Sequence, residues 1–304
     1  MNQIFIIILF LTIGIFAQRI SQLPPNLAAY LNKYLIYIVL PALALLYLPV
    51  VELRAELALP ILSAWISFGF SWIFFGFLGK KLNWTKSVTG CLIITAGLAN
   101  TSFVGFPIIN ALYGEGGVQI ALLIDQAGSF IIVSSLAIIV ASIYSADKKR
   151  KRDISKKIIT FPPFIFFLFA MFLNLFKIEL PQTAQIPLEW IALTLTPVAL
   201  TAVGLQVKIT KDAFQSTYLW LGLGYKLVLI PSLILLLFSQ VFNLKGLLLE
   251  VSVMETAMAP MITGSIIAIT HHLEPKLASL LVGVGIPLSF ATLAAWYGVL
   301  TYWF

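Results

Sequence analysis

Charge is the scarcest feature of this sequence: only 10% of its 304 residues are Asp, Glu, Lys or Arg. A soluble domain with so few charges would expose too much apolar surface, so this scarcity excludes an ordinary globular protein. The single cysteine, Cys91, excludes an internal disulfide and a cysteine-based metal cluster. The two histidines, His271 and His272, are adjacent and cannot share one helix face as paired metal ligands do. We therefore predict no structural metal and no cofactor.

Motifs for enzymatic chemistry are also missing. The sequence has no Gly-rich phosphate loop, no His-Glu-x-x-His and no Gly-x-Ser-x-Gly. An ATP-driven pump would need a nucleotide-binding domain, for which such an apolar chain leaves no room. We predict that the protein is not an enzyme. The rival interpretation, a membrane enzyme acting on lipids, has only His271 and His272 as the start of a catalytic cluster.

Hydrophobic residues make up 60% of the chain, and the mean hydropathy is +1.01. Apolar runs recur along the whole sequence between short polar stretches, and each membrane-spanning helix needs about 20 apolar residues. The pattern predicts an all-α, multi-pass membrane protein with ten spans. We place the spans at residues 3–17, 30–49, 58–79, 88–112, 119–144, 158–176, 188–206, 214–240, 246–270 and 278–303.

Basic residues concentrate in one loop, because residues 147–157 hold seven of the 19 Lys and Arg residues. The positive-inside rule places the whole loop, 145–157, in the cytoplasm. Because the ten spans alternate in direction, both termini then lie outside. The membrane that we expect is the cell membrane, either inner or plasma. The basic loop separates two halves of five spans each, residues 1–144 and 158–304. We expect the lipid bilayer to be a partner and nucleic acid not to be one.

The two halves share a pattern of helix-breaking residues. Pro41 in the second span corresponds to Pro197 in the seventh, and Pro107 in the fourth corresponds to Pro260 in the ninth. Because each half has an odd number of spans, the second half would be inverted relative to the first. Inverted repeats with interrupted helices at matching places are typical of secondary transporters, which bind their cargo where the breaks meet. We expect Pro41 and Pro197 to kink their helices.

The strongest break is the stretch 97–107, which lies within the apolar fourth span. Pro107 disrupts the helical ladder, and Gly105 tolerates unusual backbone angles. A broken helix at membrane depth is tolerated only where protein or a water-filled cavity covers its backbone. The polar Asn100 and Thr101 therefore predict a ligand site, and the alternative is a proline kink packed against its neighbours. Helix ends favour an anion between this stretch and residues 256–260.

Ionisable residues inside the predicted spans are costly, which makes them functional candidates. Asp125, with Gln126 beside it, and Glu255 are the residues that we expect to couple transport to H⁺ or Na⁺. Glu250 falls closer to the end of its span. Lys226 either pairs with a carboxylate or attracts an anionic substrate, and pairing is the favoured interpretation.

Small polar residues follow the second break. Thr263 is a further candidate for ion coupling, since it follows Pro260 at the start of the next half-helix. The alternative for Thr263, together with Gly264 and Ser265, is close packing between helices. The sequence is compatible with one metal ion, Na⁺, bound at Glu255.

The segment Asn100-Thr101-x-Phe103-x-Gly105-x-Pro107 resembles the crossover motif of the auxin efflux carrier family. That family includes bacterial members described as malonate or dicarboxylate permeases. The supporting pieces are Leu40-Pro41-Ala42, Leu200-Thr201-Ala202-Val203-Gly204 and the Pro260 segment. The resemblance covers the full length. It implies ten helices in two inverted repeats, with helices four and nine unwound and crossing, as in the related fold of bile-acid/sodium symporters.

The resemblance further implies a scaffold of spans 1, 2, 6 and 7 and a transport part of spans 3–5 and 8–10. Implied substrates are carboxylate-bearing organic anions, either auxin-like or dicarboxylate. Glu255 departs from the pattern, since it is similar to the acidic residue of the sodium site in bile-acid symporters. The residues expected to contact substrate are Asn100, Thr101, Phe103, Gly105, Pro107, Thr256, Met258 and Pro260.

These observations together predict a secondary active transporter of small organic anions that works by alternating access, most simply as a symporter. A transporter-like sensor or channel without coupled uptake is the alternative, and it predicts ligand binding without gradient-driven accumulation. Small-residue helix faces are also compatible with a homodimer.

Overall fold

The computed structural model describes residues 3–145, 161–207 and 215–303. Helix makes up 83% of the structure, and within these ranges there is no strand beyond one isolated bridge. The basic loop predicted at 145–157 lies outside the described residues apart from Ser145. The all-α prediction is therefore confirmed for the described part of the chain.

Within the described ranges, six helical stretches are long and apolar enough to cross a membrane. They are Leu27–Val50, Ala55–Lys81, Thr101–Tyr144, Gln182–Gly204, Thr217–Val241 and Pro275–Trp303. Shorter apolar helices cover Phe5–Ala17, Lys86–Gly97 and Pro162–Leu175. These lengths and compositions support a multi-pass membrane protein.

The third of these stretches is too long for one crossing. Its 44 residues would form a helix of roughly 66 Å, about twice the thickness of the hydrocarbon core. Gly114 divides it, because its backbone has φ 64° and ψ −157°, which lie outside the helical region. This glycine lies between the fourth and fifth predicted spans, 88–112 and 119–144.

The chain separates into two compact units. The first unit comprises Met1–Ala55, Ser102–Leu122 and Lys156–Gln206. Its helices are α1 (Gln3–Ala17), α2 (Leu27–Tyr34), η1 (Leu35–Val39), α3 (Leu40–Tyr47), η2 (Leu48–Val50), most of η4 (Thr101–Gly105) and α6 (Phe106–Leu123), α10 (Pro162–Leu175), α11 (Gln182–Leu193) and α12 (Leu195–Gly204).

The second unit comprises Glu56–Thr101, Leu123–Ser155 and Val207–Phe304. Its helices are η3 (Ala55–Leu57), α4 (Ala58–Lys81), α5 (Lys86–Gly97), η5 (Ile124–Phe130), α7 (Ile131–Ser134), α8 (Leu136–Tyr144), α13 (Thr217–Gly224), η7 (Tyr225–Leu229), α14 (Ile230–Leu236), η8 (Leu237–Val241), α15 (Gly246–Thr256), α16 (Ile262–Thr270) and α17 (Pro275–Trp303).

Wide π-helical turns precede three of the prolines. The turns η1, η4 and η7 end two residues before Pro41, Pro107 and Pro231, respectively. A proline inside a helix has no N–H to donate, and its ring clashes with the carbonyl four residues earlier. A wider turn relieves that clash without ending the helix. The position of each proline sets where the wide turn forms, and the steric conflict explains why the turn is wide.

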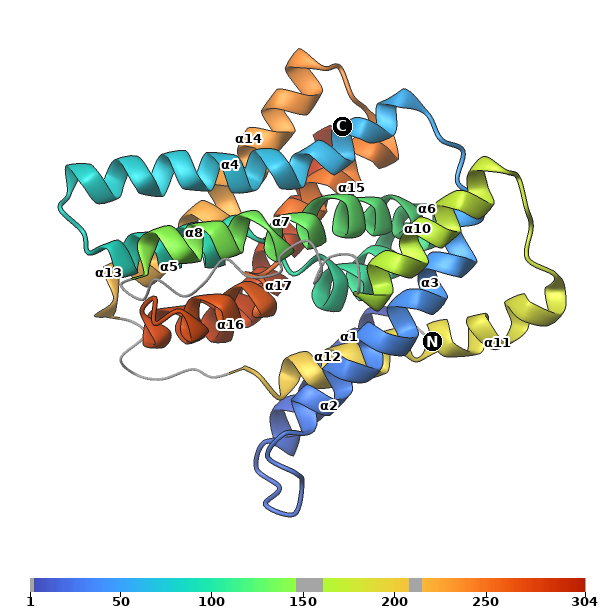
Figure 1. Cartoon of the computed structure of the whole chain (residues 1–304), viewed down its shortest axis with the longest axis horizontal. Coiled ribbons are helices and arrows are strands. Elements are labelled where there is room, and N and C mark those ends of the chain that lie inside the picture. Colours follow the sequence, from blue (N-terminus) through green and yellow to red (C-terminus); the bar gives the residue numbers. More distant parts are fainter. Residues whose placement is uncertain (1–2, 146–160, 208–214, 304) are drawn as a thin grey trace. The chain divides into compact units, whose positions relative to one another are not determined.

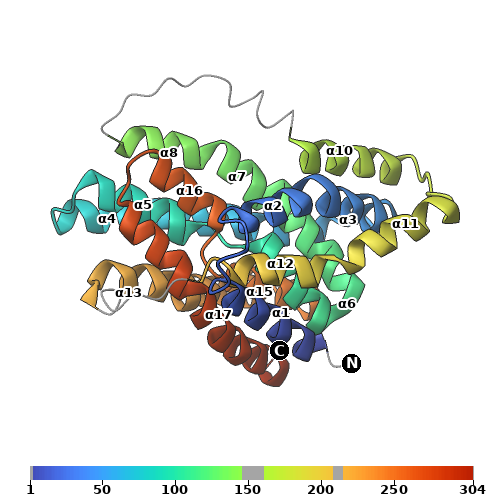
Figure 2. The ribbon, with the colours of Figure 1, turned by 90° about the horizontal axis from the view of Figure 1, so that it is seen from below.

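In the first unit, α1 and α12 lie side by side (Figures 1 and 2). Their backbones approach closely at Gly14 and Gly204, since a Cβ built on Gly204 would lie 2.8 Å from Gly14 Cα. The Gln18 side-chain amide donates a hydrogen bond of 2.7 Å to the Gly204 carbonyl oxygen. Small residues thus allow van der Waals packing, which holds helices together in lipid.

Replacing Gly14 with alanine is expected to lower the free energy of unfolding by about 1–3 kcal/mol, because the new methyl group overlaps the Thr201 carbonyl oxygen. Gly298→Ala is the matched control, since a Cβ there meets nothing within 4 Å. Thermal unfolding of both purified variants checks the prediction. Equal melting temperatures would contradict the close approach of α1 and α12.

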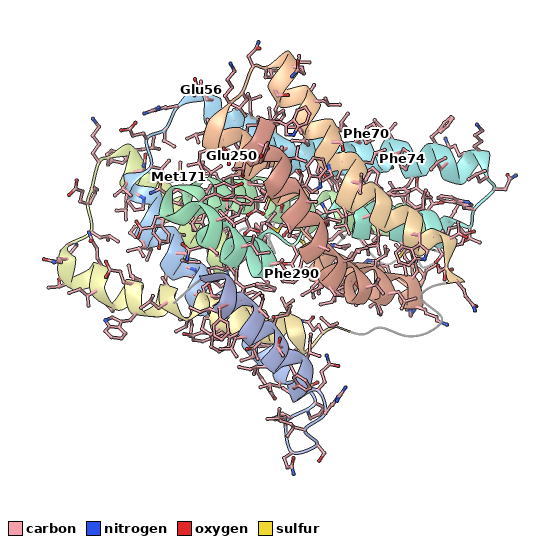
Figure 3. The ribbon with its side chains drawn as sticks, turned by 180° about the vertical axis from the view of Figure 1, so that it is seen from behind. Glu56, Phe70, Phe74, Met171, Glu250 and Phe290 are labelled. Carbon is pink, nitrogen blue, oxygen red and sulfur yellow. The ribbon has the colours of Figure 1, made fainter. Side chains whose placement is uncertain are left out.

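In the second unit, aromatic side chains of α4 pack on η7. Phe70 and Phe74, which are labelled in Figure 3, have ring centroids 6.2 and 5.4 Å from that of Tyr225. The Tyr225 hydroxyl donates a hydrogen bond of 2.8 Å to the Ser67 carbonyl oxygen. The indole N–H of Trp65 donates to the Ala127 carbonyl oxygen at 3.1 Å, so α4 also holds η5 in place.

Candidate functional site

Two interrupted helices meet in the second unit. Helix α5 ends at Gly97, after which Leu98 has the extended backbone angles φ −106° and ψ 135°. Helix α15 ends at Thr256, and α16 resumes at Ile262. Pro260 lies within the second gap and cannot donate to a helical ladder. Each break leaves backbone groups that need partners outside their own helix.

The two breaks supply those partners to each other. The Asn100 backbone N–H donates to the Ala259 carbonyl oxygen at 2.8 Å, and the Met261 N–H donates to the Leu98 carbonyl oxygen at 3.0 Å. Ala99 and Pro260 form an antiparallel bridge between these bonds. The pairing satisfies buried backbone groups as a short sheet would, which fixes the distance between the two broken helices.

Gly285 of α17 supports this crossing from outside the two breaks. A Cβ at Gly285 would lie 2.7 Å from Pro260 Cδ, so only glycine fits there without displacing the proline ring. Sequence reasoning missed Gly285, because a glycine in a long apolar span carries no local signal of what it contacts.

A carboxylate cluster lies next to the first break. Thr101 donates a hydrogen bond from its hydroxyl group to Asp125 Oδ1, and the Gln126 side-chain amide donates to Asp125 Oδ2 at 2.7 Å. Thr101 is 1% exposed and Asp125 is 3% exposed. The wide turn η5 carries both Asp125 and Gln126. These two hydrogen bonds join η5 to the first break, so Asp125 anchors η5 there.

Glu255, in the last turn of α15, is fully buried, and neither of its carboxylate oxygens has a hydrogen-bond partner among the described residues. Burial without a partner costs several kcal/mol for a charged group, so a native site of this kind demands an explanation. The charges of Asp125 and Lys226 both act on Glu255.

Glu255 faces a small internal cavity. The cavity has a volume of about 10 Å³, the space of one water molecule or one bare small cation. It is lined by Ala64, Ser67, Gly97, Leu98, Ala99, Thr101, Ile124, Ser129, Glu255 and Thr256.

The lining offers oxygen atoms to a cation. Thr101 donates its hydroxyl proton to Asp125, and Thr256 donates to the Val253 carbonyl oxygen at 2.9 Å. The lone pairs of both hydroxyl oxygens stay available as acceptors. Together with the Glu255 carboxylate they form a set of hard oxygen ligands, the kind that binds alkali and alkaline-earth cations. The same carboxylate can instead hold a proton.

Lys226 is fully buried in η7, and its ammonium nitrogen has no hydrogen-bond partner in the described part of the chain. The sequence favours an ion pair between Lys226 and a carboxylate. The described residues contain no such pair within 4 Å. The ammonium group of Lys226 is therefore buried without an ion-pair partner in this part of the chain.

Replacing Lys226 with methionine is expected to raise the free energy of unfolding by about 1–3 kcal/mol, because an unpaired buried ammonium group is removed while the volume is kept. Lys245→Met is the control, since Lys245 is exposed and the change in net charge is the same. The melting temperatures of the purified variants give the answer. A lower melting temperature for the Lys226 variant alone would show that the ammonium group has a stabilising partner.

The structure places the other predicted residues as follows. Met258 is buried in the second break, and Thr263 is exposed on α16 and does not line the cavity. Pro197 lies in the first turn of α12. Four more belong to the first unit and are buried, namely Pro41, Phe103, Gly105 and Pro107.

Sequence reasoning also missed the serines of α4. Ser63, Ser67 and Ser71 are all buried and recur every four residues, which places them on one face of the helix. Ser67 lines the cavity, and the Ser71 hydroxyl donates to the Ile93 carbonyl oxygen of α5 at 3.0 Å. A small polar stripe in an apolar span was the available signal.

An apolar helical chain, two interrupted helices paired at their breaks and buried charges beside them define a polytopic membrane protein of the transporter class. The Membrane transport protein family matches residues 1–297, and the chain belongs to this family. The match confirms the predicted resemblance to auxin efflux carriers.

Two archaeal relatives agree with the assignment. An uncharacterized transporter from Methanocaldococcus jannaschii is 24% identical over 313 residues, which cover 99% of this chain and 98% of the relative. An uncharacterized transporter from Methanothermobacter thermautotrophicus is 23% identical over 296 residues, covering 97% of this chain and 96% of the relative.

Proposed function

We propose that the protein is a secondary active transporter of carboxylate-bearing organic anions, coupled to H⁺ or Na⁺ at Glu255. The observation that carries the proposal is the fully buried Glu255 carboxylate, which has no partner among the described residues and faces a cavity with room for one small ion. The coupling ion would supply the missing partner. A proton neutralises the carboxylate, whereas Na⁺ would also use the oxygens of Thr101 and Thr256.

The anionic substrate is supported by the second break. Helix α16 starts at Ile262, two residues after Pro260, and a helix N-terminus favours negative charge. Asn100 and Thr101 lie at the other break, which is paired with this one through the backbone. The auxin efflux carrier resemblance points to the same class, auxin-like acids or dicarboxylates.

Alternating access is the mechanism that we propose for transport. The paired breaks belong to helices α5 and α15, which correspond to the fourth and ninth predicted spans. We propose that these spans are equivalent members of two inverted five-span repeats, with both termini outside and the basic loop in the cytoplasm. The presence of one break in each of these two spans supports this arrangement.

The function is tested with purified protein in liposomes that are given a panel of radiolabelled mono- and dicarboxylates. A coupled transporter accumulates its substrate above the outside concentration when a Na⁺ or pH gradient is imposed. Counterflow in preloaded liposomes detects electroneutral exchange. Saturable binding without accumulation or counterflow would favour the sensor, and equilibration without accumulation would favour the channel.

A further inference from the structure

The first unit contains a cavity of about 610 Å³, which is separate from the small cavity beside Glu255. Pockets for organic ligands typically measure about 300–1,000 Å³. Residues from α1, α3, η2, α6, α11 and α12 line it, so segments from three distant parts of the sequence build its wall. Its volume falls within the range of ligand sites.

Most of the wall is apolar, with Ile7, Leu43 and Leu46 among the side chains that face the cavity. Such a surface gains free energy when it covers the carbon skeleton of a ligand and so removes apolar area from water. The apolar part of the wall therefore sets a preference for a ligand with a hydrocarbon or aromatic body.

The polar part of the wall carries charge of one sign. Glu115 from α6 and Glu189 from α11 both line the cavity, and the described lining residues include no Lys, Arg or His. Tyr47 lines the cavity as well. Two acidic side chains from different helices therefore line the same cavity.

Both glutamates are exposed and both line the cavity, so they give its wall negative charge. The carboxylate of a bound anion would be repelled there, whereas an ammonium group would be attracted. Gln119 and Gln185 add amide oxygens that accept hydrogen bonds from an ammonium group. Tyr47 adds an aromatic face, which attracts cations through its quadrupole.

We propose that this cavity binds an organic cation, a protonated amine attached to an apolar body, with the ammonium group between Glu115 and Glu189. This site goes beyond the proposed transport of organic anions.

The test is calorimetric titration of the full-length protein in detergent with three probes that share a phenyl body. 2-Phenylethylamine should bind saturably, 3-phenylpropionate should bind at least tenfold more weakly, and phenylalanine serves as the zwitterion. Glu115→Gln and Glu189→Gln should each weaken amine binding about tenfold, because each removes a charged acceptor. Glu179→Gln, an equal charge change outside the lining, should leave it unaltered.

The inference is overturned if the folded protein shows no saturable amine binding, if the carboxylate binds as tightly as the amine, or if neither glutamine variant weakens the amine. Size-exclusion profiles establish that the variants are folded, and two separate variants guard against failure of one. The assay uses no ion gradient and no transport. Glu255→Gln, in the other unit, should retain amine binding, so a failure of the transport proposal would leave this result intact.

Discussion

Replacing Glu255 with glutamine is expected to reduce substrate uptake about 100-fold and to abolish the dependence of the residual uptake on Na⁺ or pH. Glutamine keeps the shape of the side chain but neither takes up a proton nor carries the negative charge that attracts a cation. The cavity of about 10 Å³ would then have lost its only ionisable lining residue within the described part of the chain.

The same substitution should leave the folded protein at least as stable as the wild type. Both oxygens of Glu255 are buried without a hydrogen-bond partner among the described residues, so no hydrogen bond is lost. Removal of a buried carboxylate that is not hydrogen-bonded contributes about 1–3 kcal/mol in favour of folding. Lower uptake with equal or higher stability would separate a functional role from a structural one.

Glu250→Gln is the matched control. Glu250 lies on the same helix α15, five residues earlier, and is labelled in Figure 3. It does not line the cavity, and glutamine there changes the charge by the same amount. Uptake and its ion dependence should match the wild type. Equal losses in the two variants would assign the effect to net charge and not to the cavity.

Replacing Asp125 with alanine is expected to lower the free energy of unfolding by about 2–4 kcal/mol and to abolish uptake. The change removes the acceptor for the Thr101 hydroxyl group and for the Gln126 side-chain amide. Both donors are buried, so each loses its hydrogen bond without gaining one from water. The first helix break also loses its anchor to η5.

Asp125→Asn separates the two contributions. Asparagine keeps one oxygen acceptor for Thr101 but places an amide opposite the Gln126 amide, so an intermediate loss of stability is expected. Thermal unfolding and uptake should be measured for both variants. Wild-type stability in the alanine variant would contradict the anchoring role of Asp125.

Breaks in the fourth and ninth predicted spans could be predicted from sequence, but only one of them lies at its proline. Pro260 lies within its break and lacks a backbone donor, whereas the other break follows Gly97, and Pro107 lies inside the helical stretch Thr101–Tyr144. The membrane class and the family also followed from composition and from the motif around Asn100. These features depend on a residue and its immediate neighbours, which a single sequence displays.

The contacts around the breaks could not be predicted, because they join distant segments. Ser67 and Ser129 line the cavity together with Glu255, but no local pattern places η5 and α4 beside α15. The favoured pairing of Lys226 likewise failed in the described structure, since its geometry is set by the packing of η7. Some of the ten predicted spans have no counterpart among the six long apolar stretches. An interrupted span consists of short helices, which are not long enough to count as one of these stretches.

The most direct test of the coupling role of Glu255 is the ion dependence of radiolabelled carboxylate uptake into liposomes, measured side by side for the wild type and Glu255→Gln. The wild type should accumulate substrate only when a Na⁺ or pH gradient is present, and the variant should show no gradient-driven accumulation. Accumulation by Glu255→Gln at the wild-type rate, with the same ion dependence, would contradict the assignment of Glu255 as the coupling residue.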